Sequence, residues 1–324
     1  MLVVRDAFNS SDLPTGGVAT VGNFDGVHRG QRAVIEKVLE RARETELQAM
    51  VVTFEPHPLS VLRPQEAPAR ITSLEQKAKL LDEMGVDVLL VVNFDRDFSR
   101  ITAETFVEDF LHRRLGVEEV YVGEDFVFGH RRGGDVELLE DMGEELGFTA
   151  VGLDDVTTRG ERISSTRIRR AILEGRVEAA SEMLGRPHAI EGVVVRGDRM
   201  GKRLGWPTIN LQPEGELLPA DGVYACQVLF PSFPATFECS TNIGTRPTVY
   251  ENYQRVVEAH VLDFNSDVYG EAVEIRFFRR LREERIFPTV MDLSAQIGRD
   301  VDATREFFAA RRGLKQQAGG IDSD

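Results

Sequence analysis

Residues 17–42 read GVATVGNFDGVHRGQRAVIEKVLERA, and this stretch predicts how the first half of the chain folds. An apolar run at residues 17–21 leads into a turn with glycines at positions 22, 26 and 30. From Val34 to Ala42 apolar residues recur at helical spacing. The order strand, glycine-rich turn, helix directs free backbone N–H groups and the positive end of the helix at one place, which is a geometry that binds phosphate.

His28 stands in this turn, where an imidazole could hydrogen-bond a phosphate oxygen and stabilise charge that develops there. The alternative is an ordinary polar surface group. The flanking glycines favour the functional interpretation, because a phosphate motif needs its strand and helix context.

Strand and helix patterns keep alternating along the first half. Strands are expected at residues 49–54, 86–92, 119–122 and 148–153, and helices at 74–84, 103–115, 166–174 and 175–184. Such alternation implies a parallel sheet with right-handed crossovers. The first half is therefore predicted to be a Rossmann-like α/β domain.

The second half consists of short β-prone runs with turn residues between them, which predicts a small antiparallel barrel. The runs lie at residues 189–195, 222–229, 237–242, 256–262 and 272–278. A helix pair or a single helix at residues 289–311 would close the barrel, with Leu293, Ile297, Val301 and Phe308 facing inward. Residues 185–187, Gly-Arg-Pro, break the pattern, so we expect domains at 1–186 and 187–312 and a disordered tail at 313–324.

Residues 197–210 of the second half read GDRMGKRLGWPTIN. Glycines four residues apart give a loop whose amides can turn toward an anion, and the cations between them supply positive charge. In an extended segment Thr208 and Asn210 point the same way, and their oxygens are hard ligands that suit Mg²⁺ on a nucleotide. An ordinary surface hairpin is the alternative. The phosphate contacts expected here are Gly197, Gly201, Lys202 and Gly205.

Composition narrows the class of protein. Lys and Arg number 39 against 54 Asp and Glu, a net charge of −15, which argues against a general nucleic-acid binder. Two cysteines are too few for a disulfide framework, and no basic start precedes an apolar core as in a secretory signal. The longest apolar runs have strand length and cannot span a bilayer. A cytoplasmic location is expected.

Two further loops carry groups that suit a nucleotide. Residues 123–134, GEDFVFGHRRGG, offer aromatic surfaces for a ring system and arginines for a phosphate. Aromatic side chains that anchor the loop to the core would look the same. Residues 163–170, ISSTRIRR, place hydroxyls and an arginine at a helix start, where they could cradle an anion or form a plain N-cap.

These motifs resemble those of the bacterial bifunctional riboflavin kinase/FAD synthetase family, and the resemblance covers nearly the whole chain. The first turn is similar to the nucleotidylyltransferase motif His-x-Gly-His, but Gln31 stands where the second histidine is usual. Glutamine can donate a hydrogen bond but cannot become cationic, which bears on the strength of adenylyl transfer and not on ATP binding.

For this first, nucleotidylyltransferase-type domain, the resemblance implies catalytic roles for His28 and Arg167. The loop at 123–134 is similar to the family's Gly-x-(Asp/Asn)-Phe-x-Phe-Gly, and residues 163–169 match its Ile-Ser-Ser-Thr-x-Ile-Arg. The implied ATP contacts are Gly22, Phe24, Asp25, Gly30, Gln31, Ser164, Ser165 and Thr166. The implied flavin contacts are Asp125, Phe126 and Phe128.

In the second domain, of riboflavin-kinase type, residues 207–210 resemble the family's Pro-Thr-Ala-Asn motif, and residues 242–248 its Asn-Ile-Gly-x-(Arg/Lys)-Pro-Thr. Residues 257–263 are similar to a strand whose glutamate is the catalytic base, which implies that role for Glu258. A solvated strand glutamate is the alternative. Arg282 and Arg285 lie in a segment that resembles the family's flavin-covering Leu-Arg-x-Glu-x-x-Phe loop.

The resemblance thus implies phosphorylation of riboflavin to FMN and adenylylation of FMN to FAD, with ATP and Mg²⁺. No nucleic acid or membrane partner is expected, and the chain would be a monomer or a weak homo-oligomer. One alternative is a kinase whose first domain only binds nucleotide, because of Gln31. Another is a flavin-binding regulator without activity, against which the intact Thr208, Asn210 and Glu258 argue.

Overall fold

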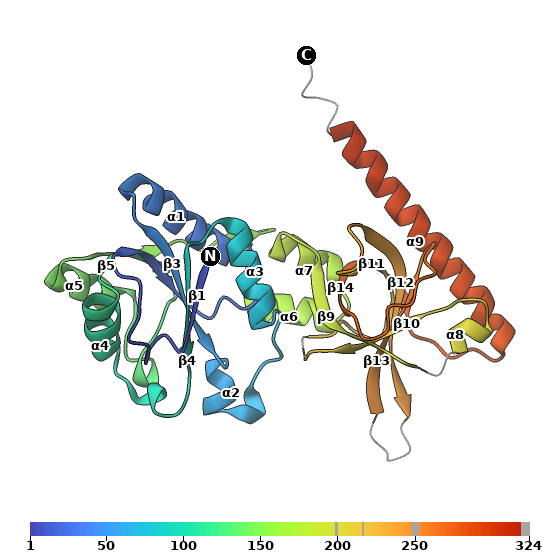
Figure 1. The fold of residues 1–324 in the computed structure, drawn as a ribbon, viewed down its shortest axis with the longest axis horizontal. Helices are drawn as coiled ribbons and strands as arrows, with labels where there is room; N and C mark the ends of the chain where they lie inside the picture. Colours follow the sequence, from blue (N-terminus) through green and yellow to red (C-terminus); the bar gives the residue numbers. More distant parts are fainter. Residues whose placement is uncertain (198–199, 216, 248–252, 319–324) are drawn as a thin grey trace. The chain divides into compact units, whose positions relative to one another are not determined.

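The computed structural model describes residues 1–197, 200–215, 217–247 and 253–318 (Figure 1). The chain divides into two compact units, residues 1–165 and 166–324. The division falls before the expected domain boundary at residue 186, which stays a prediction.

The first unit is built on six parallel strands in the order β1-β4-β3-β2-β5-β6. Their bounds are β1 (Leu2–Arg5), β2 (Gly17–Val21), β3 (Gln48–Glu55), β4 (Val88–Asn93), β5 (Val117–Gly123) and β6 (Thr149–Leu153). This confirms the predicted parallel sheet and adds β1, an edge strand that the sequence pattern did not reveal.

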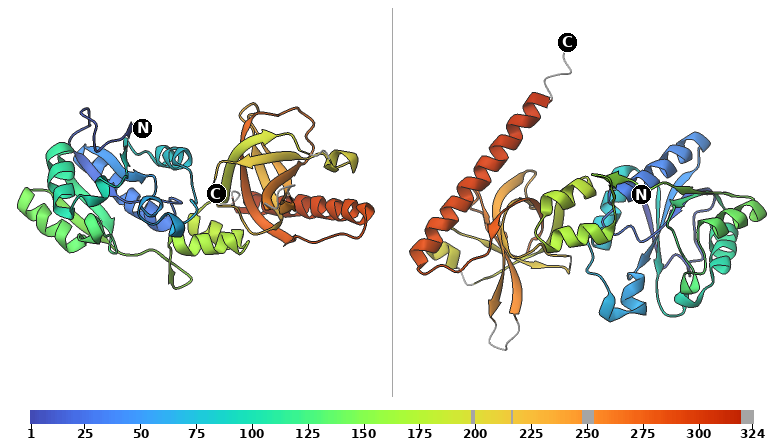
Figure 2. Two further views of the ribbon diagram at one scale, coloured as in Figure 1. Left: turned by 90° about the horizontal axis from the view of Figure 1, so that it is seen from below. Right: turned by 180° about the vertical axis from the view of Figure 1, so that it is seen from behind.

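Successive residues of one strand enter different cores, as the two-residue period of a strand requires. In β3, Met50 and Val52 pack with η3 (Phe106–Arg114, π-helical) and α5 (Val136–Leu146). Ala49 and Val51 pack with α1 (Arg29–Thr45) and α3 (Leu74–Met84). The sheet is therefore covered on both faces by helices, which is the three-layer arrangement of parallel sheets (Figure 2).

Short elements connect these layers. They are α2 (Pro58–Leu62), η1 (Pro64–Glu66), η2 (Phe98–Arg100), α4 (Ala103–Thr105), η4 (His130–Arg132), β7 (Thr157–Thr158) and β8 (Glu161–Arg162). The helix expected at 103–115 is present as α4 running into η3.

The second unit is a closed antiparallel barrel in the order β10-β13-β12-β11-β14-β9, which confirms the predicted class. Its strands are β9 (His188–Val195), β10 (Ile209–Pro213), β11 (Gly222–Leu229), β12 (Thr236–Pro247), β13 (Tyr253–Val261) and β14 (Ala272–Glu283). Buried side chains from all six strands, with Val177 of α7 (Val177–Leu184), form its core. Helix α6 (Ser165–Leu173) precedes α7, and α8 (Met200–Arg203) is one turn.

The C-terminal helix α9 (Val290–Ala318) packs against β11, β12 and β14. Of the four residues predicted to face inward, Val301 and Phe308 are buried, whereas Leu293 and Ile297 are half-buried. The helix continues past residue 312 into the segment expected to be disordered, while residues 319–324 lie outside the described part of the chain.

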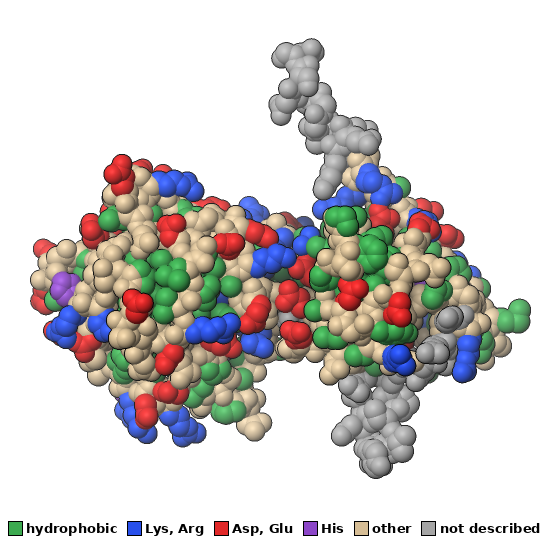
Figure 3. All heavy atoms as spheres, viewed as in Figure 1, with side chains coloured by type: hydrophobic (Ala, Val, Ile, Leu, Met, Phe, Trp, Pro, Cys, Tyr) green, Lys and Arg blue, Asp and Glu red, His purple; other side chains and the backbone are tan. Residues whose placement is uncertain are grey.

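On the face of each unit that Figure 3 shows, Lys and Arg side chains are interspersed with Asp and Glu. Among the helices that the structure describes, none is both long and apolar enough to cross a membrane.

Candidate active sites

The topology of the first unit places two of the predicted loops at one edge of its sheet. After β2 the chain adds β3 and β4 on one side, and it then returns to add β5 and β6 on the other. Ligands of open α/β sheets bind beyond the carboxyl ends of the strands where the order reverses in this way. Residues 22–28 follow β2 and residues 123–134 follow β5, so the strands that meet at this point lead into both loops.

His28 is the N-cap of α1 and forms a capping box with Gln31. Its Nδ1 accepts the backbone N–H of Gln31 at 3.3 Å, and Oε1 of Gln31 accepts the backbone N–H of His28 at 3.1 Å. Because Nδ1 is an acceptor, the proton of the neutral ring lies on Nε2. His28 can thus donate a hydrogen bond without first becoming cationic. A Cβ on Gly30 would fall 3.3 Å from this ring, so a side chain there would crowd it.

The side chains of Phe24 and Asp25 are buried and stabilise the turn from within. The Phe24 ring is 4% exposed and packs into the core below α1, so it can offer a nucleotide only its backbone. The Asp25 carboxylate is buried and accepts the backbone N–H groups of Ile71 and Thr72, at 3.0 and 3.2 Å. A Cβ on Gly22 would meet the Phe24 ring at 3.2 Å. The phosphate contacts predicted for these three residues stay predictions.

Ser165 joins the end of this unit to the same turn. Its Oγ donates to the backbone oxygen of Asp25 at 2.9 Å, so the proton of this hydroxyl is used within the turn. Ser164, half-buried, directly precedes it, and Thr166 and Arg167 form the first turn of α6. The structure counts these last two with the second unit.

The aromatic loop after β5 is fastened to the core. Phe128 is 8% exposed and stacks on Phe126, with ring centroids 5.1 Å apart. Asp125 pairs with Arg162 at 2.5 Å between Oδ2 and Nη2. Phe128 thus anchors the loop, while Phe126 and Asp125 lie nearer its surface. Their contacts with flavin stay predictions.

The second unit brings the predicted metal ligands against the predicted glycine loop. A Cβ on Gly197 would fall 2.4 Å from the Asn210 amide, and one on Gly201 would fall 3.1 Å from Oγ1 of Thr208. Backbone therefore passes directly over both side chains, as only glycine permits. Gly205 has φ of 84°, in the left-handed region. The side chain of Lys202 lies outside the described part of the structure.

Glu258 lies in a row of polar side chains across three neighbouring strands. It is directly opposite Asn210 on β10 and Asn242 on β12. Opposed residues of antiparallel strands point to the same face, with Cβ atoms about 5 Å apart. Since Val257 and Ala259 fill the barrel core, this row lies on the outer face, where Glu258 is half-buried. A carboxylate therefore stands beside one of the proposed metal ligands.

The segment that leads to Thr208 is fixed on two sides. His260 of β13 hydrogen-bonds the backbone oxygen of Pro207 through Nδ1, at 2.7 Å. Its ring meets Trp206 edge-on, with centroids 5.4 Å apart, and Nε1 of Trp206 donates to Oγ of Ser294 on α9 at 3.1 Å. The strand that carries Glu258 thus also positions Thr208.

Arg282 forms a bidentate ion pair with Asp300 of α9. Its Nη2 and Nε lie 2.8 and 3.0 Å from the Asp300 oxygens. Phe287 lies under the guanidinium groups of Arg282 and Arg285, at 5.6 and 5.3 Å. Arg282 therefore ties β14 to α9, and direct contact of the two arginines with flavin stays a prediction.

Sequence reasoning assigned no role to Asn242, Lys77 or Thr72. Asn242 was visible in a motif, but its place beside Glu258 follows from strand register. Lys77 did leave a signal: it lies three residues after Leu74 and four before Leu81, on the face of α3 that its apolar residues define as buried.

Comparisons with known proteins cover both units. Residues 10–167 match the family model described as FAD synthetase, and residues 184–308 match the model described as riboflavin kinase. The chain is 41% identical, over 312 residues, to a protein of Escherichia coli (strain K12) named bifunctional riboflavin kinase/FMN adenylyltransferase. That match covers 95% of this chain and 98% of the relative.

Proteins of the same name from Pseudomonas fluorescens and Haemophilus influenzae are 38% and 35% identical to this chain. These matches cover 95% of this chain and 98% and 99% of the two relatives. A solved structure described as a macrolide-efflux protein from Streptococcus pneumoniae is 28% identical and superposes with a TM-score of 0.85, over 94% of this chain and 98% of that one.

Proposed function

This chain belongs to the family of bifunctional riboflavin kinases/FMN adenylyltransferases, and from this premise we propose which residues carry out its two reactions. It is a transferase with a riboflavin kinase domain and an FMN adenylyltransferase domain. Riboflavin, FMN and ATP are its proposed substrates.

In the kinase reaction, Glu258 accepts the proton of the riboflavin 5′-hydroxyl, and that oxygen attacks the γ-phosphate of ATP. The bond to ADP breaks and FMN is formed. The half-buried position of Glu258, opposite Asn210 and Asn242, supports this role, because a base must stand beside the phosphate site. Catalysis otherwise rests on positioning and neutralisation of charge.

Thr208 and Asn210 would hold Mg²⁺. Hydroxyl and amide oxygens suit this ion, and glycine backbone passes close to both side chains. The bound ion would neutralise charge on the phosphates of ATP. Backbone N–H groups of the 197–205 loop would contact the same phosphates.

In the adenylyl transfer, a phosphate oxygen of FMN attacks the α-phosphate of ATP, and the bond to pyrophosphate breaks to give FAD. No protein nucleophile is needed. His28 would donate from Nε2 to the α-phosphate oxygens, with the N-terminal amides of α1 around Gly30 and the hydroxyl of Ser164. Arg167, three residues on from Ser164 in the chain, would add positive charge.

The observation that carries this proposal is that each unit has its predicted phosphate-binding residues at a place that its fold favours: His28 after β2, and Asn210 opposite Glu258 on the barrel. The deciding experiment incubates the full chain with FMN, ATP and Mg²⁺ and measures FAD by chromatography. We expect FAD. No FAD above background, with FMN still formed in a parallel incubation with riboflavin, would favour the kinase-only alternative, and neither product would favour the regulator.

A further inference from the structure

The turn between β2 and α1 is strained. Phe24 and Val27 have φ of 45° and 41°, in the left-handed region, although neither is glycine. A β-branched residue such as Val27 is an outlier there. Conformations of this kind persist only where surrounding contacts fix them, and they gather at functional sites. The contacts that fix this turn therefore determine how His28 is presented.

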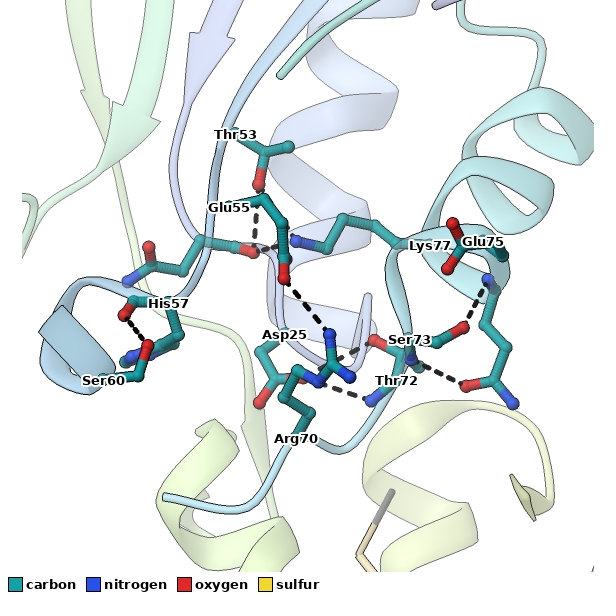
Figure 4. Close-up of polar contacts among 12 residues, drawn as sticks. Asp25, Thr53, Glu55, His57, Ser60, Arg70, Thr72, Ser73, Glu75 and Lys77 are labelled. Carbon is teal, nitrogen blue, oxygen red and sulfur yellow. Dashed lines mark hydrogen bonds and ion pairs between the residues drawn. The ribbon is translucent and has the colours of Figure 1, made fainter. Parts of the chain in front are cut away.

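One of these contacts comes from the buried ammonium of Lys77, on α3. Its Nζ donates to the backbone oxygen of Asn23 at 2.7 Å and to Oγ1 of Thr53 at 3.0 Å. Thr53 donates to the same Asn23 oxygen at 3.2 Å. Figure 4 shows Lys77 extending from α3 toward Thr53. Lys77 is 5% exposed, so its ammonium acts on the protein's own backbone, directly before Phe24.

A second contact comes from the residues just before α3. Oγ1 of Thr72 accepts the backbone N–H of Gly26 at 3.1 Å, while Asp25 accepts the backbone N–H groups of residues 71 and 72. Thr72 and Asp25 are each 6% exposed. The segment 71–77 thus holds the turn on both sides of Phe24. Figure 4 shows Thr72 of this segment beside Asp25 of the turn.

We propose that Lys77 is a positioning residue for adenylyl transfer, which holds Asn23 while Thr72 holds Gly26 and so keeps the turn in the conformation that presents His28 to ATP. The inference rests on the proposed role of His28. Charge matters here, because a carbonyl accepts a stronger hydrogen bond from an ammonium than from a neutral donor. Lys77 touches neither substrate nor reacting atoms.

The surroundings of Lys77 make its charge sensitive to pH. Asp25 of the turn and Glu55 at the end of β3 favour the ammonium, whereas Arg70, which pairs with Glu55 at 3.1 Å, opposes it. Burial is the largest influence and lowers the pKa of Lys77 to about 8. Above this pH the bond to Asn23 weakens, so FAD formation should decline more steeply than FMN formation.

The test is Lys77→Met in the full chain, which removes the ammonium and keeps an unbranched apolar stem. The kcat for FAD formation should fall about 10- to 100-fold, with KM for FMN changed less than about threefold, because the loss lies in presentation of His28. Riboflavin phosphorylation should not change. The decline of FAD formation above pH 8 should disappear. Lys79→Met, an exposed lysine of the same helix, is the matched control and should alter neither reaction.

Thr72→Val, which is nearly isosteric, removes the hydrogen bond from Gly26 to the Thr72 hydroxyl. It tests the inference if Lys77→Met does not fold. It should lower kcat for FAD formation about fivefold or more. If Lys77→Met folds, FAD formation within twofold of wild type, or an unchanged pH profile, would overturn the inference. If it does not fold, FAD formation within twofold of wild type in Thr72→Val would overturn it. If His28→Ala abolishes FAD formation and these variants do not lower it, only the role of Lys77 is lost. If His28→Ala has no effect, the proposed function itself fails.

Discussion

His28 and Gln31 hold each other at the first turn of α1 through two reciprocal hydrogen bonds, each from the backbone N–H of one residue to the side chain of the other. Gln31 is therefore more than a weakened copy of the usual histidine. Its amide oxygen accepts the backbone N–H of His28, and its own backbone N–H holds the ring that carries the proposed chemistry.

From this capping pair we predict opposite effects for two substitutions of Gln31. Gln31→His should raise FAD formation from FMN, because imidazole can carry a positive charge toward the phosphates and an amide cannot. Gln31→Ala should lower it severalfold, since the cap is lost. Rates of FAD formation, with riboflavin phosphorylation measured in parallel, check both. Equal changes in the two reactions would count against separate sites.

Glu258→Gln should abolish riboflavin phosphorylation, by about 10²- to 10⁴-fold, because the amide cannot accept the hydroxyl proton. FAD synthesis from supplied FMN should survive. Glu214→Gln, an exposed glutamate of the same unit, is the control for loss of one charge. Full kinase activity in Glu258→Gln would show that the base lies elsewhere.

Asn210→Ala should raise the Mg²⁺ concentration for half-maximal FMN formation about tenfold or more, because one proposed ligand is lost. Gln212→Ala changes an exposed side chain two residues along the same strand and should leave the Mg²⁺ dependence as it is. The measurement is a Mg²⁺ titration of kinase activity at fixed ATP. Identical curves for the two variants would remove Asn210 from the metal site.

Asp300→Asn should destabilise the second unit by about 3 kcal/mol, because it leaves the largely buried Arg282 without its charged partner. Trp206 is the sole tryptophan of the chain and lies in this unit, so its fluorescence during urea unfolding reports the change. Asp302→Asn, exposed on the same helix, should have little effect. Equal midpoints for the two variants would contradict a structural role for the Arg282 pair.

Lys77 should make the first unit more stable as pH rises from 8 toward 10.5. Its pKa is about 8 when folded and 10.5 as the ordinary value, so the unfolded chain binds more protons across this window, and stability rises with pH there. The full gain is about 3 kcal/mol. Calorimetry of wild type and Lys77→Met at pH 7.5, below the window, and at pH 9.5, inside it, checks this: the wild type should gain stability relative to the variant. A constant difference would refute it.

The sequence predicted elements whose apolar period is local and clear. The ends of β2 and α3 agree with the residues expected, 17–21 and 74–84. Strand β1 was not predicted, because its side chains are largely exposed, with Leu2 at 54%, and because its partner strand β4 lies far away in the sequence.

The candidate sites were predicted as motifs, but their assembly was not. Asn210, Asn242 and Glu258 meet because barrel closure fixes the register of three strands, which no local pattern encodes. Composition alone did not distinguish whether the Phe128 ring contacts flavin or packs into the core. The structure shows that the ring is buried. Lys77 could have been noticed as a cation at an apolar position of α3, but its partner Asn23 lies far along the chain.

The alternation of β13 has a consequence for how this enzyme can vary. Val257 and Ala259 fill the barrel while Glu258, between them, faces outward. A shift of β13 by one residue relative to β10 and β12 would exchange the two faces, putting a carboxylate among hydrocarbons and valine beside Asn210. The alternation of this one strand therefore serves the packed core and the proposed base together, and the register of β13 must be kept for both.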